Sequence, residues 1–269
     1  MNFTTVGGFL LGLVLVVLAV MHSTDKPSIY IDVAGILLVL GGLVAAALVS
    51  FPMAELKRLT KVIGIIMTRE KMDVTSTILR IQQLATVVSR EGLDALDAHM
   101  GKIEPHFLRD GLEMVVDQVH PDEIMAVMER RIELTYEREL VEAKILRTLG
   151  KMAPSFGMLG TTVGLVNMMS NLDFSGFEKV GAGFATALAT TFYGLILAYL
   201  IFAPLANRLE ARAEERVLEM RLIAEGVLLI ARRVPASLVL HRLQAYVPPR
   251  MWTAQEGQGR SGMKRASGY

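Results

Sequence analysis

Long runs of apolar residues alternate with polar, charged segments along the sequence. Four runs contain no charged residue and reach the length of about 20 residues that an α-helix needs to cross roughly 30 Å of hydrocarbon. These runs are residues 2–24, 33–54, 152–172 and 180–207. We therefore predict an all-α membrane protein with four transmembrane helices. The first run lacks the basic start and the cleavage site of a secretory signal, so we expect it to be retained.

The segment between the second and third runs has the periodicity of helices, because its apolar residues recur every three or four positions. Breaks fall at glycines and prolines, namely Gly92, Gly101, Pro105 and Pro121. The pattern predicts two short helices, 75–89 and 107–119, and one long helix, 122–150. The same period continues after the fourth run, so we expect helices 3 and 4 to extend beyond the bilayer.

Basic residues gather on one side of the predicted membrane helices. They are Lys57, Arg58 and Lys61 after helix 2, Lys144, Arg147 and Lys151 before helix 3, and Arg208, Arg212 and Arg216 after helix 4. Because positive residues favour the cytoplasmic side, we predict a multi-pass protein with both termini and the large insert in the cytoplasm.

The chain is predicted to have five parts. They are residues 1–54, peripheral helices 1 and 2; 55–151, a cytoplasmic helical domain; 152–207, helices 3 and 4; 208–247, a cytoplasmic helical extension; and 248–269, a disordered tail.

Composition narrows the functional classes. The mean hydropathy is +0.42 and 52% of the residues are hydrophobic, which is typical of a membrane protein. The chain has no cysteine, and its five histidines lack the spacing of metal ligands, so we expect neither disulfides nor a metal site. Segment 55–151 has 15 basic and 17 acidic residues, net −2, and segment 208–269 has 11 and 6, net +5. Neither charge indicates a nucleic acid as partner.

Small residues line one side of helices 3 and 4. They are Gly157, Gly160 and Gly164 on helix 3, and Gly183, Ala187, Thr191, Gly194 and Ala198 on helix 4. Such stripes let helices approach closely in lipid, where the hydrophobic effect does not drive their association. Helix packing alone is a sufficient explanation for each of these glycines.

Two threonines of this helix pair lie at the same predicted depth. Thr161 comes eleven residues before the end of helix 3 and Thr191 eleven residues after the start of helix 4, which places both roughly 16 Å below the outer surface. Each has a second threonine beside it, Thr162 and Thr190. A membrane threonine often bonds its own i−4 carbonyl. The alternative is a shared polar site whose hydroxyl oxygens bind a passing hard cation such as sodium.

The interiors of helices 3 and 4 contain no acidic residue, although proton and cation relays in membranes commonly use a carboxylate. If ions pass here, another chain must supply the carboxylate. Asp32, at the outer end of helix 2, is the acid of this chain nearest to such a path. It either attracts cations to an entrance or simply faces water at the interface.

Several segments together match a known family. They are GKMAPSFGMLGTTVGLVNMMSNLD and ATALATTFYGLILAYLIFAPLANRLEAR in helices 3 and 4, IYIDVAGILLVLGG in helix 2, and SREGLDALD in the insert. This combination resembles the MotA/PomA family, the A subunits of bacterial flagellar stators. The resemblance implies an ion-channel subunit of the bacterial inner membrane, not an enzyme and without a cofactor beyond the transported Na⁺ or H⁺. It also implies a homopentamer around a dimer of a MotB/PomB-like B subunit, which carries the ion-binding aspartate, and contact with the rotor switch protein FliG.

The resemblance implies ion-path roles for residues near the outer half of the membrane. Thr161 and Thr191 match threonines that line the sodium path in the PomA branch, and Thr190 lies beside them. Asp32 matches an acid that the same branch places near the ion path. Because proton-driven members often carry alanine at the second threonine position, this pattern favours sodium over protons.

Other residues are implied to couple ion flow to movement. Pro154 and Pro204 match the coupling prolines of the family, although Pro154 is also suited to a helix start and Pro204 to a simple kink. In the insert, Asp97 stands at the rotor-contacting glutamate position of the family. Ser89 occupies the usual arginine position, and Arg90 follows one residue later. Solvated surface charge is the alternative for both Arg90 and Asp97.

Magnitudes are compatible with a mechanism of this kind. One ion crossing the membrane field yields about 2.3 kcal/mol per 100 mV, whereas an exposed ion pair is worth about 0.2–1 kcal/mol, so ion flow is able to break such contacts repeatedly.

Three other functions are alternatives to a stator subunit. They are an ExbB/TolQ-like energiser, which has three membrane helices; a small-molecule permease, which needs mid-membrane substrate contacts; and a structural anchor that conducts no ions.

Overall fold

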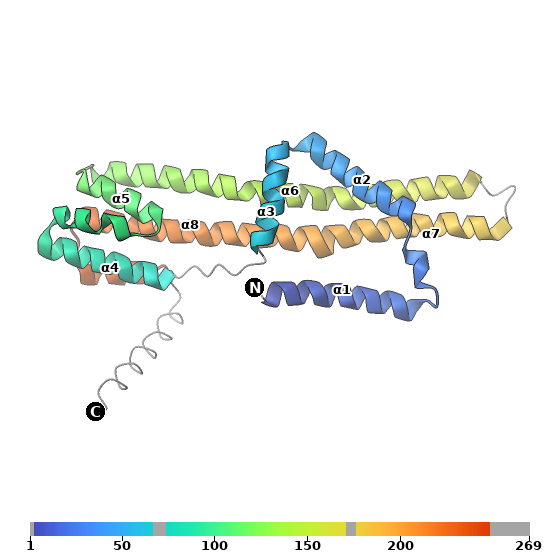
Figure 1. Cartoon of the computed structure of the whole chain (residues 1–269), viewed down its shortest axis with the longest axis horizontal. Helices are drawn as coiled ribbons and strands as arrows, with labels where there is room; N and C mark the ends of the chain where they lie inside the picture. The colour runs from blue at the N-terminus through green and yellow to red at the C-terminus, as the bar shows by residue number, and fades with distance from the viewer. Residues whose placement is uncertain (1–2, 67–73, 171–175, 248–269) are drawn as a thin grey trace, which may run out of the picture. The chain divides into compact units, whose positions relative to one another are not determined.

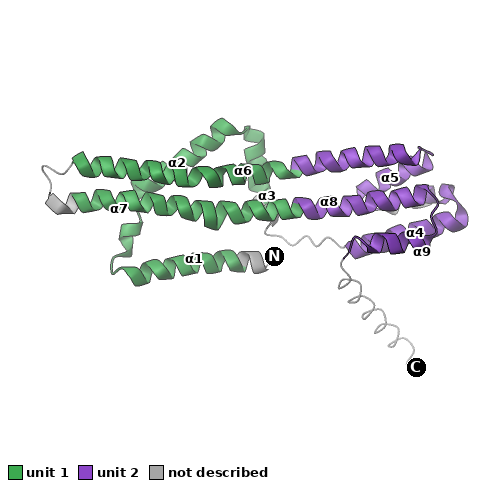
Figure 2. Ribbon diagram, turned by 180° about the vertical axis from the view of Figure 1, so that it is seen from behind, with its two compact units in different colours: residues 1–70, 139–212 green, residues 71–138, 213–269 purple. Residues whose placement is uncertain are grey.

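Helices form all of the regular structure that a computed structural model describes, over residues 3–66, 74–170 and 176–247 (Figure 1). The predicted all-α fold is therefore confirmed. The helices separate into two compact units, each made of two stretches of the chain (Figure 2). Unit 1 comprises Met1–Glu70 and Glu139–Arg212, and unit 2 comprises Lys71–Arg138 and Ala213–Tyr269.

Each unit combines short helices with parts of two long ones. Unit 1 contains α1 (Phe3–Ser23), η1 (Pro27–Tyr30), α2 (Val33–Ser50), α3 (Met53–Ile66), the second part of α6 (Pro121–Ser170), α7 (Gly176–Leu195), the π-helical η3 (Ile196–Phe202) and the start of α8 (Ala203–Ala231). Unit 2 contains α4 (Val74–Glu91), η2 (Leu93–Lys102), α5 (His106–Val116), the remaining parts of α6 and α8, and α9 (Ala236–Gln244).

α6 is one continuous helix of 50 residues. It joins the predicted helix 122–150 to the predicted helix 3, in agreement with the expectation that helix 3 continues past its apolar run. Its start agrees with the sequence: Pro121 occupies the first position, where its missing N–H is not needed, and Asp122 complements the positive end of the helix. Pro154 lies in the interior of α6, so the alternative of a helix start at Pro154 is wrong.

The core of unit 2 consists of large apolar side chains contributed by its helices. Those with almost no exposed surface are Ile78 and Ile81 of α4, Leu96 of η2, Leu108 and Leu112 of α5, Ile124 and Met128 of α6, and Leu222, Ile223 and Leu229 of α8. Unit 1 has a second core with many smaller members: Val39, Leu43 and Ala47 of α2, Leu59 of α3, Ala143, Ile145, Leu146, Leu149 and Ala153 of α6, Ala198 of η3, and Ala206 and Leu209 of α8.

Two helical stretches of the described chain are long and apolar enough to cross a membrane, Pro27–Ser50 and Val180–Ala231. They correspond to the predicted helices 2 and 4. The described apolar part of α1 is shorter, Gly7–Ser23. The apolar end of α6 is rich in glycine and hydroxyl side chains, which lower its hydropathy. The two long apolar stretches support the prediction of a membrane protein, whereas the count of four spans stays a prediction.

The two compact units cut across the ranges predicted from the sequence. α3 groups with unit 1, and both long helices are shared, with divisions at residues 138/139 and 212/213. The five predicted ranges stay predictions, and the range 248–269, expected to be a disordered tail, lies outside the described residues.

Candidate functional site

The hydroxyl groups of Thr161 and Thr191 meet between α6 and α7 of unit 1. Their Oγ1 atoms are 2.6 Å apart, so the two residues that share a predicted depth also share a hydrogen bond. Thr161 Oγ1 further lies 3.1 Å from the carbonyl oxygen of Gly157 and 3.2 Å from that of Ala187. Both side chains are half-buried.

Several oxygen atoms lie close together in this cluster. The single Thr161 hydroxyl proton has three oxygens in reach, and the carbonyl of Ala187 also accepts a bond from Thr190 at 2.9 Å. Hydroxyl and carbonyl oxygens are the ligands that hard cations prefer. The cluster is therefore chemically suited to binding a cation without a full negative charge of its own.

Glycines bring the two helix backbones close enough for this bond. A Cβ atom at Gly157 would lie 3.0 Å from the carbonyl oxygen of Thr190, and one at Gly164 would lie 2.8 Å from the nitrogen of Ala187. At Gly194 the neighbour would be the carbonyl oxygen of Ala153, at 2.6 Å. Two further predicted packing glycines also lie in tight places. A Cβ atom at Gly160 would lie closest to Thr190, and one at Gly183 would lie closest to Met168.

Thr190 occupies a different environment from its neighbour Thr191. It is 1% exposed, and its hydroxyl bonds the carbonyl of Ala187. A Cβ atom at Gly35 would lie only 2.7 Å from the methyl carbon of Thr190. Thr190 thus packs between α2 and α6, and a direct ion-path role for it stays a prediction.

Asp32 begins α2 as its N-terminal cap. Its Oδ2 accepts a hydrogen bond from the Gly35 amide at 3.1 Å, which satisfies one of the free N–H groups at the start of the helix. Its own N–H donates to the Tyr193 hydroxyl at 2.8 Å, and that hydroxyl donates to the carbonyl of Tyr30. No role was predicted for Tyr193, although a polar tip on a membrane helix was an available signal.

The two predicted coupling prolines lie in different helical settings. Pro154 is inside α6 of unit 1, one residue after the buried Ala153. Pro204 is the second residue of α8, directly after the π-helical η3. Because proline has no N–H to donate, the wider π-helical turn fits the missing bond. Their role in coupling stays a prediction.

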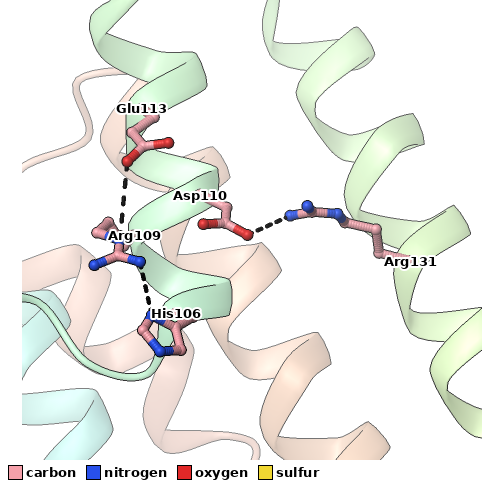
Figure 3. Close-up of polar contacts among 5 residues, drawn as sticks. All are labelled: His106, Arg109, Asp110, Glu113 and Arg131. Carbon is pink, nitrogen blue, oxygen red and sulfur yellow. Dashed lines mark hydrogen bonds and ion pairs between the residues drawn. The ribbon is translucent and has the colours of Figure 1, made fainter.

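Unit 2 carries the predicted rotor-contacting charges on its surface. Arg90 lies in the last turn of α4 and Asp97 in η2, and both are exposed. Over the residues that the structure describes, neither forms an ion pair. Other charges of unit 2 are paired (Figure 3): Arg131 bonds Asp110 at 2.7 Å, and Arg109 contacts His106 and Glu113 on α5, at 2.7 Å and 3.9 Å.

The fold and the site together define a class of protein: a helical membrane protein with a neutral, hydroxyl-bearing contact between two apolar helices and a helical unit with charged residues on its surface. Residues 99–222 match the MotA/TolQ/ExbB proton channel family. The chain is 33% identical to the chemotaxis protein PomA of Vibrio alginolyticus, over 86% of this chain and 89% of that protein. It is 26% identical to motility protein A of Bacillus subtilis, over 98% of both chains.

A solved structure has the same fold. The flagellar MotAB stator complex from Bacillus subtilis matches with a TM-score of 0.85 at 25% identity, over 93% of this chain and 97% of that chain. The chain therefore belongs to the MotA/TolQ/ExbB proton channel family, in the branch of the flagellar stator proteins MotA and PomA. The family consists of channel proteins, so the prediction that the chain is not an enzyme is confirmed.

Proposed function

We propose that this protein is the A subunit of a sodium-driven flagellar stator, in which cations pass the Thr161–Thr191 pair and drive torque on the rotor. A stator subunit that forms an ion channel with a MotB-type partner is the function of its relatives in the MotA/PomA branch. The observation that carries the proposal is the 2.6 Å contact between the two hydroxyls inside an uncharged helix pair.

A B subunit supplies the carboxylate that this chain lacks. Segments 152–170 and 180–207 contain no acidic residue, and oxygen ligands without charge bind a permeating ion only weakly. A MotB/PomB-like helix with one aspartate, placed beside the Thr161–Thr191 pair, completes the site. In this arrangement five copies of the chain surround two B subunits, and each copy offers the same neutral oxygen cluster in turn.

The membrane arrangement follows the sequence. Four helices cross the inner membrane, unit 2 lies in the cytoplasm, and both termini are cytoplasmic, because the basic residues flank the same ends of the spans. Asp32 then lies at the outer end of α2, where its carboxylate attracts cations toward the path.

Torque arises at the exposed charges of unit 2. Arg90 and Asp97 contact charged residues of FliG, and the helix irregularities at Pro154 and Pro204 transmit the effect of ion passage. Since about 2.3 kcal/mol per 100 mV is released for each ion, and each exposed ion pair is worth about 0.2–1 kcal/mol, one ion is sufficient to exchange one such contact.

Swimming speed measured against sodium concentration at constant pH tests the ion path. In a strain lacking its own stator A subunit, Thr161→Ala and Thr191→Ala should each raise the sodium concentration for half-maximal speed by roughly tenfold, the scale of one lost polar interaction. Thr162→Ala is the matched control, because within the described residues the exposed Thr162 hydroxyl bonds only its own i−4 carbonyl, of Met158, at 3.1 Å.

The outcomes separate the parts of the proposal. Equal effects of Thr162→Ala and Thr161→Ala would contradict a special role for the hydroxyl pair. A speed that follows pH and ignores sodium would contradict sodium as the coupling ion. For the rotor contact, Arg90→Glu combined with Asp97→Lys should abolish swimming while the amount of protein in the membrane stays normal; unchanged torque would remove both residues from the rotor surface.

A further inference from the structure

The Tyr193 hydroxyl links α7 to the start of α2 across 161 residues of sequence. It accepts a hydrogen bond from the Asp32 amide at 2.8 Å and donates its own proton to the carbonyl of Tyr30. The ring of Tyr30 also packs edge-on against Phe192, with centroids 5.6 Å apart. Tyr193 therefore holds the two residues on either side of Ile31, where the chain leaves η1 and enters α2.

Both bonds use groups that the helices themselves leave without partners. The N–H of an N-terminal cap residue lies before the first helical bond, so the Asp32 amide needs an outside acceptor. The Tyr30 carbonyl, at the end of η1, accepts the proton of the same hydroxyl. A phenylalanine at position 193 would fill the same space but make neither bond.

The Asp32 carboxylate is bonded to the first turn of α2. Its Oδ2 is held by the Gly35 amide at 3.1 Å, while a Cβ atom at Gly35 would lie 2.8 Å from the same oxygen. That oxygen therefore faces the first turn of α2. Within the described part of the chain, Oδ1 of Asp32 forms no hydrogen bond, so this oxygen is available to attract a cation.

α7 makes three contacts with neighbouring helices within one helical turn. Thr190 packs against Gly35 of α2, Thr191 bonds Thr161 of α6, and Tyr193 bonds the Asp32 amide. The helix that carries one hydroxyl of the proposed ion path thus also fixes the acid proposed at its entrance.

We propose that Tyr193 is a positioning residue that holds Asp32 at the entrance of the ion path through its hydroxyl group. This inference rests on the proposed function, because it assigns Tyr193 to the cation-attracting role of Asp32. It makes Tyr193 a determinant of the apparent sodium affinity and not of the maximal rate, since within the described residues its hydroxyl bonds the Asp32 amide and the Tyr30 carbonyl and not the Thr161–Thr191 pair.

The test is the sodium dependence of swimming speed in the intact motor at constant pH. Tyr193→Phe should raise the sodium concentration for half-maximal speed by about two- to tenfold, the range of one net hydrogen bond, with little change in the speed at saturating sodium. Tyr199→Phe is the matched control, because Tyr199 lies in the adjoining η3, is 70% exposed and has no hydrogen bond within the described residues. Loss of maximal speed without a shift in sodium dependence would overturn the inference.

A double-mutant cycle separates this inference from the function on which it rests. Asp32→Asn alone should raise the half-maximal sodium concentration, and Tyr193→Phe should add little to it when both changes are combined. If Asp32→Asn has no effect, the proposed role of Asp32 fails. If Asp32→Asn shifts the curve and Tyr193→Phe does not, or if the Tyr193→Phe shift keeps its full size in the Asp32→Asn background, Tyr193 does not act through Asp32.

Discussion

Units 1 and 2 are both helical, but their helices meet in different ways. In unit 1, α6 and α7 approach so closely that a Cβ atom at Gly157, Gly164 or Gly194 would reach backbone atoms of the facing helix within 3.0 Å. In unit 2, the glycine Gly111 also lies in a tight place, but its nearest neighbours would be the ends of side chains, Met128 Cε and Val227 Cγ2, both at 2.9 Å.

This difference agrees with two different surroundings. In water, burial of large apolar side chains supplies the main driving force, and unit 2 has such a core. In lipid that force is absent between helices, so close backbone contact and hydrogen bonds take its place, as in the Gly-lined contact that carries the Thr161–Thr191 bond. The comparison predicts that each unit is sensitive to a different kind of substitution.

The largest loss of stability is expected from a cavity in the core of unit 2. Leu112 of α5 has no exposed surface, and Leu112→Ala should lower the free energy of unfolding by about 2–5 kcal/mol. Leu238→Ala on α9 is the control, because Leu238 is 45% exposed. Thermal unfolding of the purified protein, followed by circular dichroism, measures both. Equal shifts in the two variants would contradict a side-chain core in unit 2.

A smaller loss is expected from overpacking the helix contact of unit 1. Gly164→Ala places a methyl group 2.8 Å from the Ala187 nitrogen and 2.9 Å from its Cα, and backbone atoms can yield only if the helices separate. We expect a cost of about 1–3 kcal/mol together with loss of swimming.

Gly111→Ala in unit 2 is the counterpart that sharpens the comparison. The flexible end of Met128 is able to shift, and alanine gains about 1 kcal/mol of helix propensity over glycine. The net change in unfolding temperature should therefore be small. A larger effect at Gly111 than at Gly164 would reverse the distinction between the two units.

Local patterns in the sequence predicted the helices and the partners within one helix pair. Apolar periodicity gave the helical character of the insert, and counting residues from the helix ends brought Thr161 and Thr191 to one depth, where their hydroxyls lie 2.6 Å apart. The extension of helix 3 past its apolar run was also predicted, and α6 continues without a break across Lys151.

Contacts between distant segments could not be predicted in this way. The Tyr193–Asp32 bond joins residues 161 positions apart, and the Arg58–Glu142 bond joins residues 84 apart. Such pairs depend on how one helix is rotated against another, and short-range periodicity does not fix that rotation.

The Arg58–Glu142 pair provides a test of intermediate size within unit 1. Arg58 of α3 bonds Glu142 of α6, whose side chain is only 5% exposed, whereas the Arg58 side chain is 47% exposed. Because solvent screens the arginine, we expect a coupling free energy of about 1 kcal/mol and not the several kcal/mol of a fully buried pair. A double-mutant cycle with Arg58→Ala and Glu142→Gln measures it, and a coupling near zero would mean that this pair does not hold α3 on α6.

The pH dependence of this pair follows from the shift of the arginine. The hydrogen bond from Arg58 to Glu142 is the main cause that raises the pKa of Arg58 above its usual value. A raised folded-state pKa stabilises the protein fully below the unfolded pKa and loses that contribution only as pH rises through the folded value. The contribution of the Arg58 charge to stability should therefore be constant between about pH 6 and pH 9, because this range lies far below the pKa of Arg58 in either state.

The smallest effect is expected at the ion pairs on the surface of unit 2. Arg131 and Asp110 form a 2.7 Å contact (Figure 3), but their side chains are 49% and 34% exposed. Water and salt screen such a pair, so Arg131→Ala should lower the free energy of unfolding by only about 0.2–1 kcal/mol, and by less at high salt. A loss as large as that of Leu112→Ala would mean that paired charges, and not apolar side chains, hold α5 on α6, and the contrast between the units would then need a different physical basis.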